Sequence, residues 1–255
     1  MLAFLLSFFV SLIPTLAVYR WIRSLRKDDA AYFNLCDKMF RAGVVSALPI
    51  IVVSGTLSLL LHMTGLKASH ALLYEALHSF IVLALTEEMV KFLTFRRTLG
   101  ENDDSYSSLD MTAMMTLVGL GFGAAENLVL AITSGVGVML IRAVTLGHGG
   151  YGFVVGYFYG KGVKSGNNGY KALGIVLIWL MHGLYDFSLD EEFTAYNEDL
   201  SAIIAVTLAF MSVVLAVTLI AYFTRARKNG LYMSPPTGSL DGAAGAEEKN
   251  DPPQP

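Results

Sequence analysis

Seven apolar runs dominate the sequence, and each is long enough to cross a lipid bilayer as a helix. A hydrocarbon core about 30 Å thick needs about 20 predominantly apolar residues. The runs cover residues 1–19, 43–63, 71–95, 111–133, 136–160, 172–189 and 201–223. Only 15% of the 255 residues are charged, against about 25% in soluble proteins. These features predict an all-α fold, a polytopic transmembrane helix bundle of about seven spans.

The basic residues predict the orientation of this bundle. They are concentrated in segments 20–41, 96–97, 161–171 and 225–228, whereas the alternate loops contain only Lys67. Cytoplasmic loops of membrane proteins carry the excess of Lys and Arg. The first run has no basic n-region and no small-residue cleavage site, so we interpret it as an uncleaved span. The pattern predicts an N-terminus outside and a cytoplasmic C-terminus.

Two segments lie outside the predicted spans. Residues 28–42 are amphipathic, which predicts a short interfacial helix that lies on the membrane. Its lipid-facing side chains would be Tyr32, Phe33, Met39 and Phe40. Residues 230–255 are rich in Pro, Gly, Ser and acidic residues and cannot bury enough apolar area to fold. The chain is therefore expected to consist of a transmembrane domain at 1–229, with a catalytic core at about 71–190, and a disordered cytoplasmic tail.

Ionisable side chains lie inside four consecutive runs, the third to the sixth. A charge at the middle of a bilayer costs about 2.5–3.5 kcal/mol, and such residues usually serve a function. The polar residues that lie away from the outer ends of these four runs and that we single out are Glu87, Glu88, Lys91, Glu126, Asn127, Arg142, His148, His182 and Asp186. The first, second and seventh runs have no ionisable residue in their central turns.

In the third run, Lys91 lies four residues after Glu87 and three after Glu88. Both spacings place the ammonium on the same helix face as the carboxylates. Lys91 can neutralise one carboxylate while the other, about 100° round the helix, points elsewhere. This predicts one structural and one reactive carboxylate without deciding which is which. The alternative is a charge cluster at the membrane interface, since Arg96 and Arg97 follow closely.

In the fourth and fifth runs, glycines accompany the polar residues. Gly and Ala residues at 119–125 should let another helix approach Glu126, and the glycines spaced by four at 152–160 predict a close-packing face. Arg142 is expected either to pair with Glu126 or to extend toward the interface. His148 lies near the middle of its run.

In the sixth run, Asp186 follows His182 by one helical turn, so the carboxylate can reach the imidazole or both can face one centre. Four other residues lie near the outer ends of the runs and are expected to stay outside any site. They are His62, His70, Glu75 and His78.

Glutamate and histidine side chains at similar depth suit hydrolysis inside the membrane. A Glu can act as general base on water, while a His polarises a carbonyl or stabilises an oxyanion. The same set could hold a divalent metal such as zinc through two His and one or two Glu. The metal ligands would then be Glu88, Glu126, His148 and His182. The sequence leaves both mechanisms open, and it contains neither a His-Glu-x-x-His nor a Gly-x-Ser-x-Gly motif.

Four short motifs in order resemble the PrsW family of intramembrane proteases and the wider group of CAAX-prenyl endopeptidases and bacteriocin-processing membrane proteases. They are Glu-Glu-x-x-Lys, Phe-x-x-x-Glu-Asn from Phe122 to Asn127, the mid-run His148, and His-x-x-x-Asp. The CAAX group usually has His where this chain has Glu126, so the chain is closer to PrsW. The resemblance implies that Glu87 or Glu88 activates water, that Glu126 and His148 complete the site, and that His182 and Asp186 support it.

The resemblance also implies a bacterial or archaeal plasma membrane and a membrane protein or peptide substrate such as an anti-sigma factor. Lys91, Asn127 and Arg142 are expected to support the site. No nucleic-acid partner is expected, and the sequence does not predict an oligomeric state. The alternatives are a proton- or ion-coupled transporter that uses the buried Glu and His residues, and a non-catalytic scaffold of the same fold.

Overall fold

The computed structural model describes residues 2–101, 105–133 and 136–231, and all regular structure in these ranges is helical, as predicted. The elements are α1 (Leu2–Arg23), the 3-10 turn η1 (Ser24–Arg26), α2 (Ala30–Met63), α3 (Leu66–Ser69), α4 (Ala71–Leu77), the π-helix η2 (His78–Leu85), α5 (Thr86–Leu99), α6 (Ser108–Thr133), α7 (Val136–Thr145), α8 (Gly147–Ser165), α9 (Asn168–Ser188), α10 (Glu191–Tyr196) and α11 (Glu198–Lys228). From residue 232 onward, the predicted tail lies outside the described residues.

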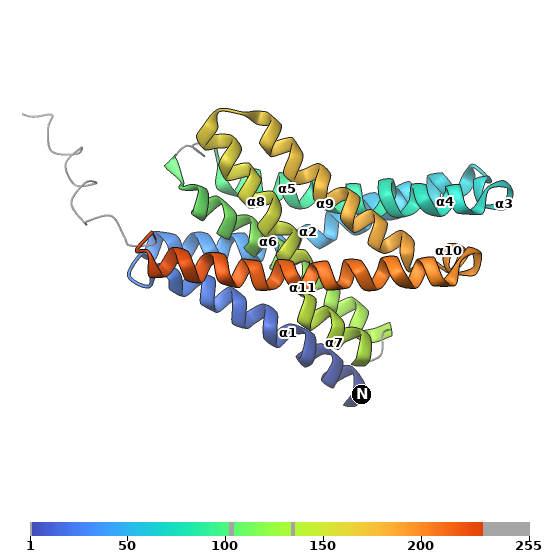
Figure 1. Cartoon of the computed structure of the whole chain (residues 1–255), viewed down its shortest axis with the longest axis horizontal. Helices are drawn as coiled ribbons and strands as arrows, with labels where there is room; N and C mark the ends of the chain where they lie inside the picture. Colours follow the sequence, from blue (N-terminus) through green and yellow to red (C-terminus); the bar gives the residue numbers. More distant parts are fainter. Residues whose placement is uncertain (1, 102–104, 134–135, 232–255) are drawn as a thin grey trace, which may run out of the picture.

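Helix α6 lies at the centre of the bundle and packs most extensively against α8 and α2 (Figure 1). Its residues 111–120 are all buried. A helix that is apolar and buried on every side must be covered by neighbours all round. Helix α11 runs along the length of the bundle beside α8 and α9 (Figure 1). The core therefore forms around α6, and the polar end of this helix, at Glu126 and Asn127, is held between its neighbours.

Glycines allow the backbones of α6, α2 and α8 to approach each other closely. A Cβ at Gly119 would lie 2.0 Å from the carbonyl oxygen of His148, and one at Gly121 would lie 2.1 Å from that of Phe40. On α8, a Cβ at Gly152 would lie 2.4 Å from the carbonyl oxygen of Met115. These are backbone contacts that a side chain cannot relieve by rotating. The predicted close-packing role of both glycine series is confirmed.

Replacing Gly119 with alanine should therefore destabilise the fold by about 1–3 kcal/mol, the usual cost of overpacking a well-packed core. Thermal unfolding of the detergent-solubilised protein would measure the change. The matched control is Gly55→Ala in α2, because a Cβ there meets nothing within 4 Å. Alanine is also the better helix former, so the control should be neutral or stabilising. Equal melting temperatures for the two variants would contradict the close α6–α8 approach.

The prediction of a separate interfacial helix at 28–42 is wrong. Residues 30–63 form one continuous helix, α2. Tyr32 and Met39 do not face lipid but are 5% and 0% exposed, and the Tyr32 hydroxyl donates to the carbonyl of Ile22 in α1 (3.2 Å). The apolar face of this amphipathic segment is covered by protein, because α2 packs against α6 and α1 along its first half.

The prediction of one uninterrupted helix over residues 136–160 is also wrong. Helix α7 ends at Thr145 and α8 begins at Gly147. Between them Leu146 has a φ of 47°, in the left-handed region that is costly for a branched residue. Helix α7 turns away and packs against α1, whereas α8 packs against α6 (Figure 1). Because of this break, Arg142 and His148 lie on two differently oriented helices, α7 and α8, and extend into the interior from different directions.

The run at 71–95 likewise departs from a regular α-helix. Its middle part, His78–Leu85, is a π-helix, with α4 before it and α5 after it. The 100° per residue of an α-helix therefore does not relate residues on the two sides of this segment, such as His78 and Glu87.

Four helical stretches of the described chain are long and apolar enough to cross a bilayer. They are Ala30–Met63, Ser108–Ile132, Glu198–Lys228 and Val136–Ser165, the last of which consists of α7 and α8. Helix α1, the α4–η2–α5 segment and α9 account for the other three predicted runs. The chain is thus a multi-pass helical membrane protein, and the count of seven spans and the orientation stay predictions.

Candidate active site

The polar residues of the four runs meet in the interior of the bundle. Helix α5 contributes Glu87, Glu88 and Lys91, α6 contributes Glu126 and Asn127, α7 and α8 contribute Arg142 and His148, and α9 contributes His182 and Asp186. All nine are joined by hydrogen bonds or charge contacts within 4.0 Å.

Glu88 is the carboxylate that Lys91 neutralises. Lys91 Nζ donates to Glu88 Oε1 over 2.6 Å, and the two side chains are only 1% and 2% exposed. The same oxygen lies 2.8 Å from His182 Nδ1. Because a carboxylate only accepts hydrogen bonds, this ring nitrogen must be the donor. Glu88 therefore orients His182 and places its Nε2 atom on the side of Glu87 and Asp186.

His148 is fixed on both sides of its ring. Lys91 Nζ lies 3.0 Å from His148 Nδ1, and His148 Nε2 lies 2.6 Å from Glu126 Oε2. An ammonium has donors only, so Nδ1 is the acceptor and Nε2–H donates to the carboxylate. Both imidazoles thus donate one N–H to a glutamate, the arrangement commonly found behind metal-binding histidines.

Glu126 lies at the other edge of the cluster. Its carboxylate also accepts from the Arg142 guanidinium, whose Nε donates to Asn127 Oδ1 over 2.6 Å. The predicted pairing of Arg142 with Glu126 is confirmed, and Asn127 completes the clamp. Because the chain breaks at Leu146, α7 and α8 both bring a side chain to the same carboxylate.

Glu87 differs from both other glutamates. Its Oε2 atom is buried and has no hydrogen-bond partner among the described residues. Lys91 Nζ lies 3.8 Å from Oε2, and His182 Nε2 lies 3.9 Å from it. These distances are too long for hydrogen bonds. Oε2 of Glu87 is therefore a buried carboxylate oxygen that lies beside Lys91 and His182 without a hydrogen bond to either.

Three side chains could hold a metal ion. Glu87, His148 and His182 each offer one ligand atom, and these atoms lie within 4.8 Å of one another. This group differs from the predicted ligand set, which contained Glu88 and Glu126. Glu88 binds Lys91 and His182, and Glu126 binds Arg142 and His148. Glu88 and Glu126 therefore bind ring nitrogens of the histidines and are not part of the candidate metal-binding group.

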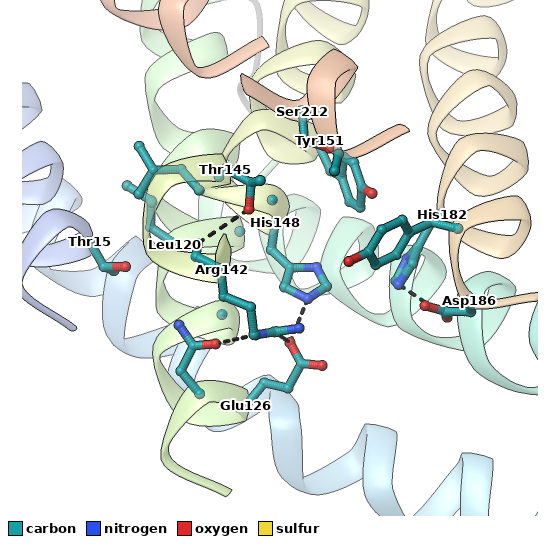
Figure 2. A pocket seen from close by; sticks show the side chains of 18 residues that line it. Thr15, Leu120, Glu126, Arg142, Thr145, His148, Tyr151, His182, Asp186 and Ser212 are labelled. Carbon is teal, nitrogen blue, oxygen red and sulfur yellow. Dashed lines mark hydrogen bonds and ion pairs between the residues drawn. The ribbon is translucent and has the colours of Figure 1, made fainter. Parts of the chain in front are cut away.

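A cavity of about 70 Å³ opens beside the histidines (Figure 2). A water molecule has a share of about 30 Å³ in the liquid, so the space suits about two waters. In Figure 2, Glu126, Arg142 and His148 point toward one another on one side, and His182 with Asp186 lies on the other. Asp186 Oδ2 is 3.4 Å from His182 Nε2.

The cavity wall contains residues that the sequence did not single out. Tyr151 and Tyr185 line it, as do Thr15 from α1 and Ser212 from α11. Tyr151 is 5% exposed, and its ring lies 5.3 Å from that of His182. Both tyrosines stand three residues after a predicted site histidine, a helical spacing that could have identified them.

The four residues expected to stay outside the site do so. None of them lines the cavity, judged over the described part of the chain. His78 Nε2 lies 3.0 Å from the Ser58 hydroxyl, and Lys67 Nζ donates to Glu75 over 2.7 Å. These contacts tie α4 and η2 to α2 and α3.

Known proteins resemble this chain over most of its length. Residues 33–226 match the model of a family described as "PrsW family intramembrane metalloprotease". A relative named Protease PrsW from Oceanobacillus iheyensis is 27% identical over 180 residues, covering 69% of this chain and 79% of the relative. Relatives with the same name from Geobacillus kaustophilus (27% over 181 residues, 69% and 76%) and Clostridioides difficile (27% over 198 residues, 73% and 80%) are similar. No solved structure matches the chain.

The family match includes α2 to most of α11 and every polar residue of the cluster around Glu88 and His148. It decides between the alternatives of protease and transporter that the buried Glu and His residues left open. Because a protease family model covers about three quarters of the sequence, the chain belongs to the PrsW family of intramembrane proteases.

Proposed function

We propose that the chain is an endopeptidase that hydrolyses peptide bonds of membrane-associated proteins, with Glu87 activating the attacking water. One observation carries this assignment: Glu87 Oε2 is a buried carboxylate oxygen without a hydrogen-bond partner among the described residues, close to two histidines. A buried carboxylate atom left unpaired is costly, so such atoms point to a function.

The proposed chemistry is general acid–base catalysis by Glu87. Its Oε2 accepts a proton from water as the water oxygen attacks the carbonyl carbon of the scissile peptide bond. When the tetrahedral intermediate collapses, the C–N bond breaks and the same proton passes to the leaving amine. Glu87 ends as a carboxylate, and the products are a carboxylic acid and an amine.

The other polar residues hold this geometry. Glu88 fixes His182 through Nδ1, and Glu126 fixes His148 through Nε2. Lys91 balances the charge of Glu88, and Arg142 that of Glu126. Glu88, Glu126 and Asp186 thus act in the proposal by orienting the histidines, and Asn127 by orienting Arg142.

The residues fit a divalent metal such as zinc. Glu87 Oε2 has no partner among the described residues, His182 Nε2 faces it, and both imidazoles donate their other N–H to a carboxylate. Glu87, His148 and His182 would hold the ion, so that Glu87 would act as a ligand in place of its role as the base, and the Lys91 ammonium beside His148 Nδ1 would have to move aside. When bound, such an ion lowers the pKa of a coordinated water and polarises a carbonyl.

The relatives come from bacteria, and the proposed location is the plasma membrane of a bacterium. A segment of a single-span membrane protein, such as a membrane-anchored anti-sigma factor, is the proposed substrate class. The site lies inside a helical bundle whose outer surface is apolar, so a substrate would reach it from the bilayer.

The test is cleavage in proteoliposomes that contain the purified chain and single-span reporter proteins. The membrane segments of these reporters are taken from the membrane proteome of a bacterial host. We expect cleavage of some reporters by the wild-type chain and none by the Glu87→Gln variant. If no reporter in a broad set is cut by the folded wild-type chain, the protein is a scaffold and the proposal fails.

Metal removal separates the two mechanisms. We expect a chelator to reduce cleavage by at least about 100-fold, since a catalytic metal supplies several kcal/mol, and added zinc to restore it. Elemental analysis should find about one zinc per chain in the wild type and less in His182→Ala. Full activity in protein shown to be metal-free would overturn the metal assignment and leave Glu87 as the base of a glutamic peptidase.

A further inference from the structure

The π-helix η2 leads directly into the turn that carries Glu87 and Glu88. Residues 78–85 have the i→i+5 pattern, and α5 starts at Thr86. π-helical segments are rare, are usually single turns, and often lie at functional sites. An eight-residue segment in this conformation needs neighbours that stabilise it.

Helix α9 supplies these neighbours through one face. The indole Nε1–H of Trp179 donates to the carbonyl oxygen of Phe80, within η2, over 2.6 Å. One turn later, a Cβ at Gly183 would lie 2.6 Å from the ring of Phe80 and 3.1 Å from its Cα. Trp179 and Gly183 are four residues apart, so they share a face of the helix. His182, between them, binds Glu88.

The π pattern sets the rotational position of both carboxylates, Glu87 and Glu88, relative to His182. A change from i→i+5 to i→i+4 bonding in one turn would shift the following helix by about one residue, or about 100°. Glu87 and Glu88 are also about 100° apart. Loss of the π turn would therefore move the unpaired oxygen of Glu87 away from His182, or exchange the places of the two carboxylates.

We propose that Trp179 is a positioning residue, whose indole N–H holds the Phe80 carbonyl and thereby keeps η2 in the π conformation that directs Glu87 at His148 and His182. This inference rests on the proposed function of Glu87. The hydrogen bond has no substitute within the bilayer, because water is scarce there. The indole N–H of Trp179 is bound to the Phe80 carbonyl, so Trp179 acts on the site through η2.

The test variant is Trp179→Phe, which keeps an aromatic ring and removes the donor. We expect kcat for the reporter that the wild type cleaves to fall at least about tenfold with KM within twofold, since a misplacement of about 1 Å can cost about 100-fold. The matched control is Trp21→Phe, at the other tryptophan of the chain. Trp21 packs edge-on against Phe223, away from η2, and its replacement should leave both constants unchanged.

A second variant and a stability measurement distinguish the loss of positioning from misfolding. Gly183→Ala should displace Phe80 and lower kcat in the same way, and thermal unfolding would verify that each variant is folded. Wild-type kcat in folded Trp179→Phe, or a raised KM with kcat unchanged, would overturn the positioning role. If Glu87→Gln also cleaved the reporter at the wild-type rate, the proposed function itself would have failed.

Discussion

Glu87→Gln is expected to lower kcat for reporter cleavage by about 10²–10⁴-fold, the range typical of the loss of a general base. Glutamine has nearly the same volume and can still accept a hydrogen bond, but it cannot take the proton of the attacking water. The fold should tolerate it, because Oε2 makes no hydrogen bond to another described residue. Steady-state kinetics in proteoliposomes and thermal unfolding would measure the two effects.

Two other glutamates serve as comparisons for this variant. Glu75→Gln is the matched control, since Glu75 is 5% exposed and pairs with Lys67 outside the cavity; its kcat should equal that of the wild type. Glu88→Gln should lose less kcat than Glu87→Gln but more stability, because Glu88 accepts from both Lys91 and His182. A Glu87→Gln rate within tenfold of the wild type would assign the base to another residue.

Contacts between residues one helical turn apart could be predicted from the sequence. A contact of Lys91 with one of the two carboxylates, and of Asp186 with His182, follows from helix spacing and needs no knowledge of the tertiary fold. For Arg142 the sequence left two alternatives, because an arginine within a span needs an acidic partner or the interface, and the structure has the pairing with Glu126.

Breaks in helix geometry could not be predicted. Gly147 follows the break, but the residue with the positive φ is Leu146, a type that gives no signal for it; α7 packs on α1 and α8 on α6 on the two sides of this residue. The π pattern of η2 likewise depends on α9, which lies about 100 residues later in the chain. For this reason, the sequence could not decide between Glu87 and Glu88.

Amphipathic patterns have a related ambiguity. Tyr32 and Met39 have the spacing of a lipid-facing stripe, yet they pack inside the bundle. An apolar stripe requires an apolar neighbour, but lipid and protein both meet this requirement. Tyr151 and Tyr185 were not identified from the sequence for a different reason. Aromatic residues within spans are common, and they carry no charge that requires a partner.

Lys91→Met is expected to destabilise the protein by about 3–5 kcal/mol, the usual cost of leaving a buried charge without its partner. The ammonium is 1% exposed and contacts Glu88 Oε1, His148 Nδ1 and the face of the Phe122 ring. Its removal leaves Glu88 as an uncompensated buried carboxylate. Methionine fills much of the same volume, so the change tests charge more than packing. Chemical unfolding in detergent micelles would measure the free energy.

The double variant Lys91→Met with Glu88→Gln provides the decisive comparison. It removes both charges together, so it should recover at least half of the lost stability, whereas two independent effects would simply add. Lys38→Met, at an exposed lysine, should change the stability by no more than about 0.5 kcal/mol. The double variant should still cleave poorly, because His148 and His182 each lose a charged partner. Additive losses would mean that Lys91 stabilises the bundle through His148 and Phe122, and that Glu88 does not depend on its ammonium.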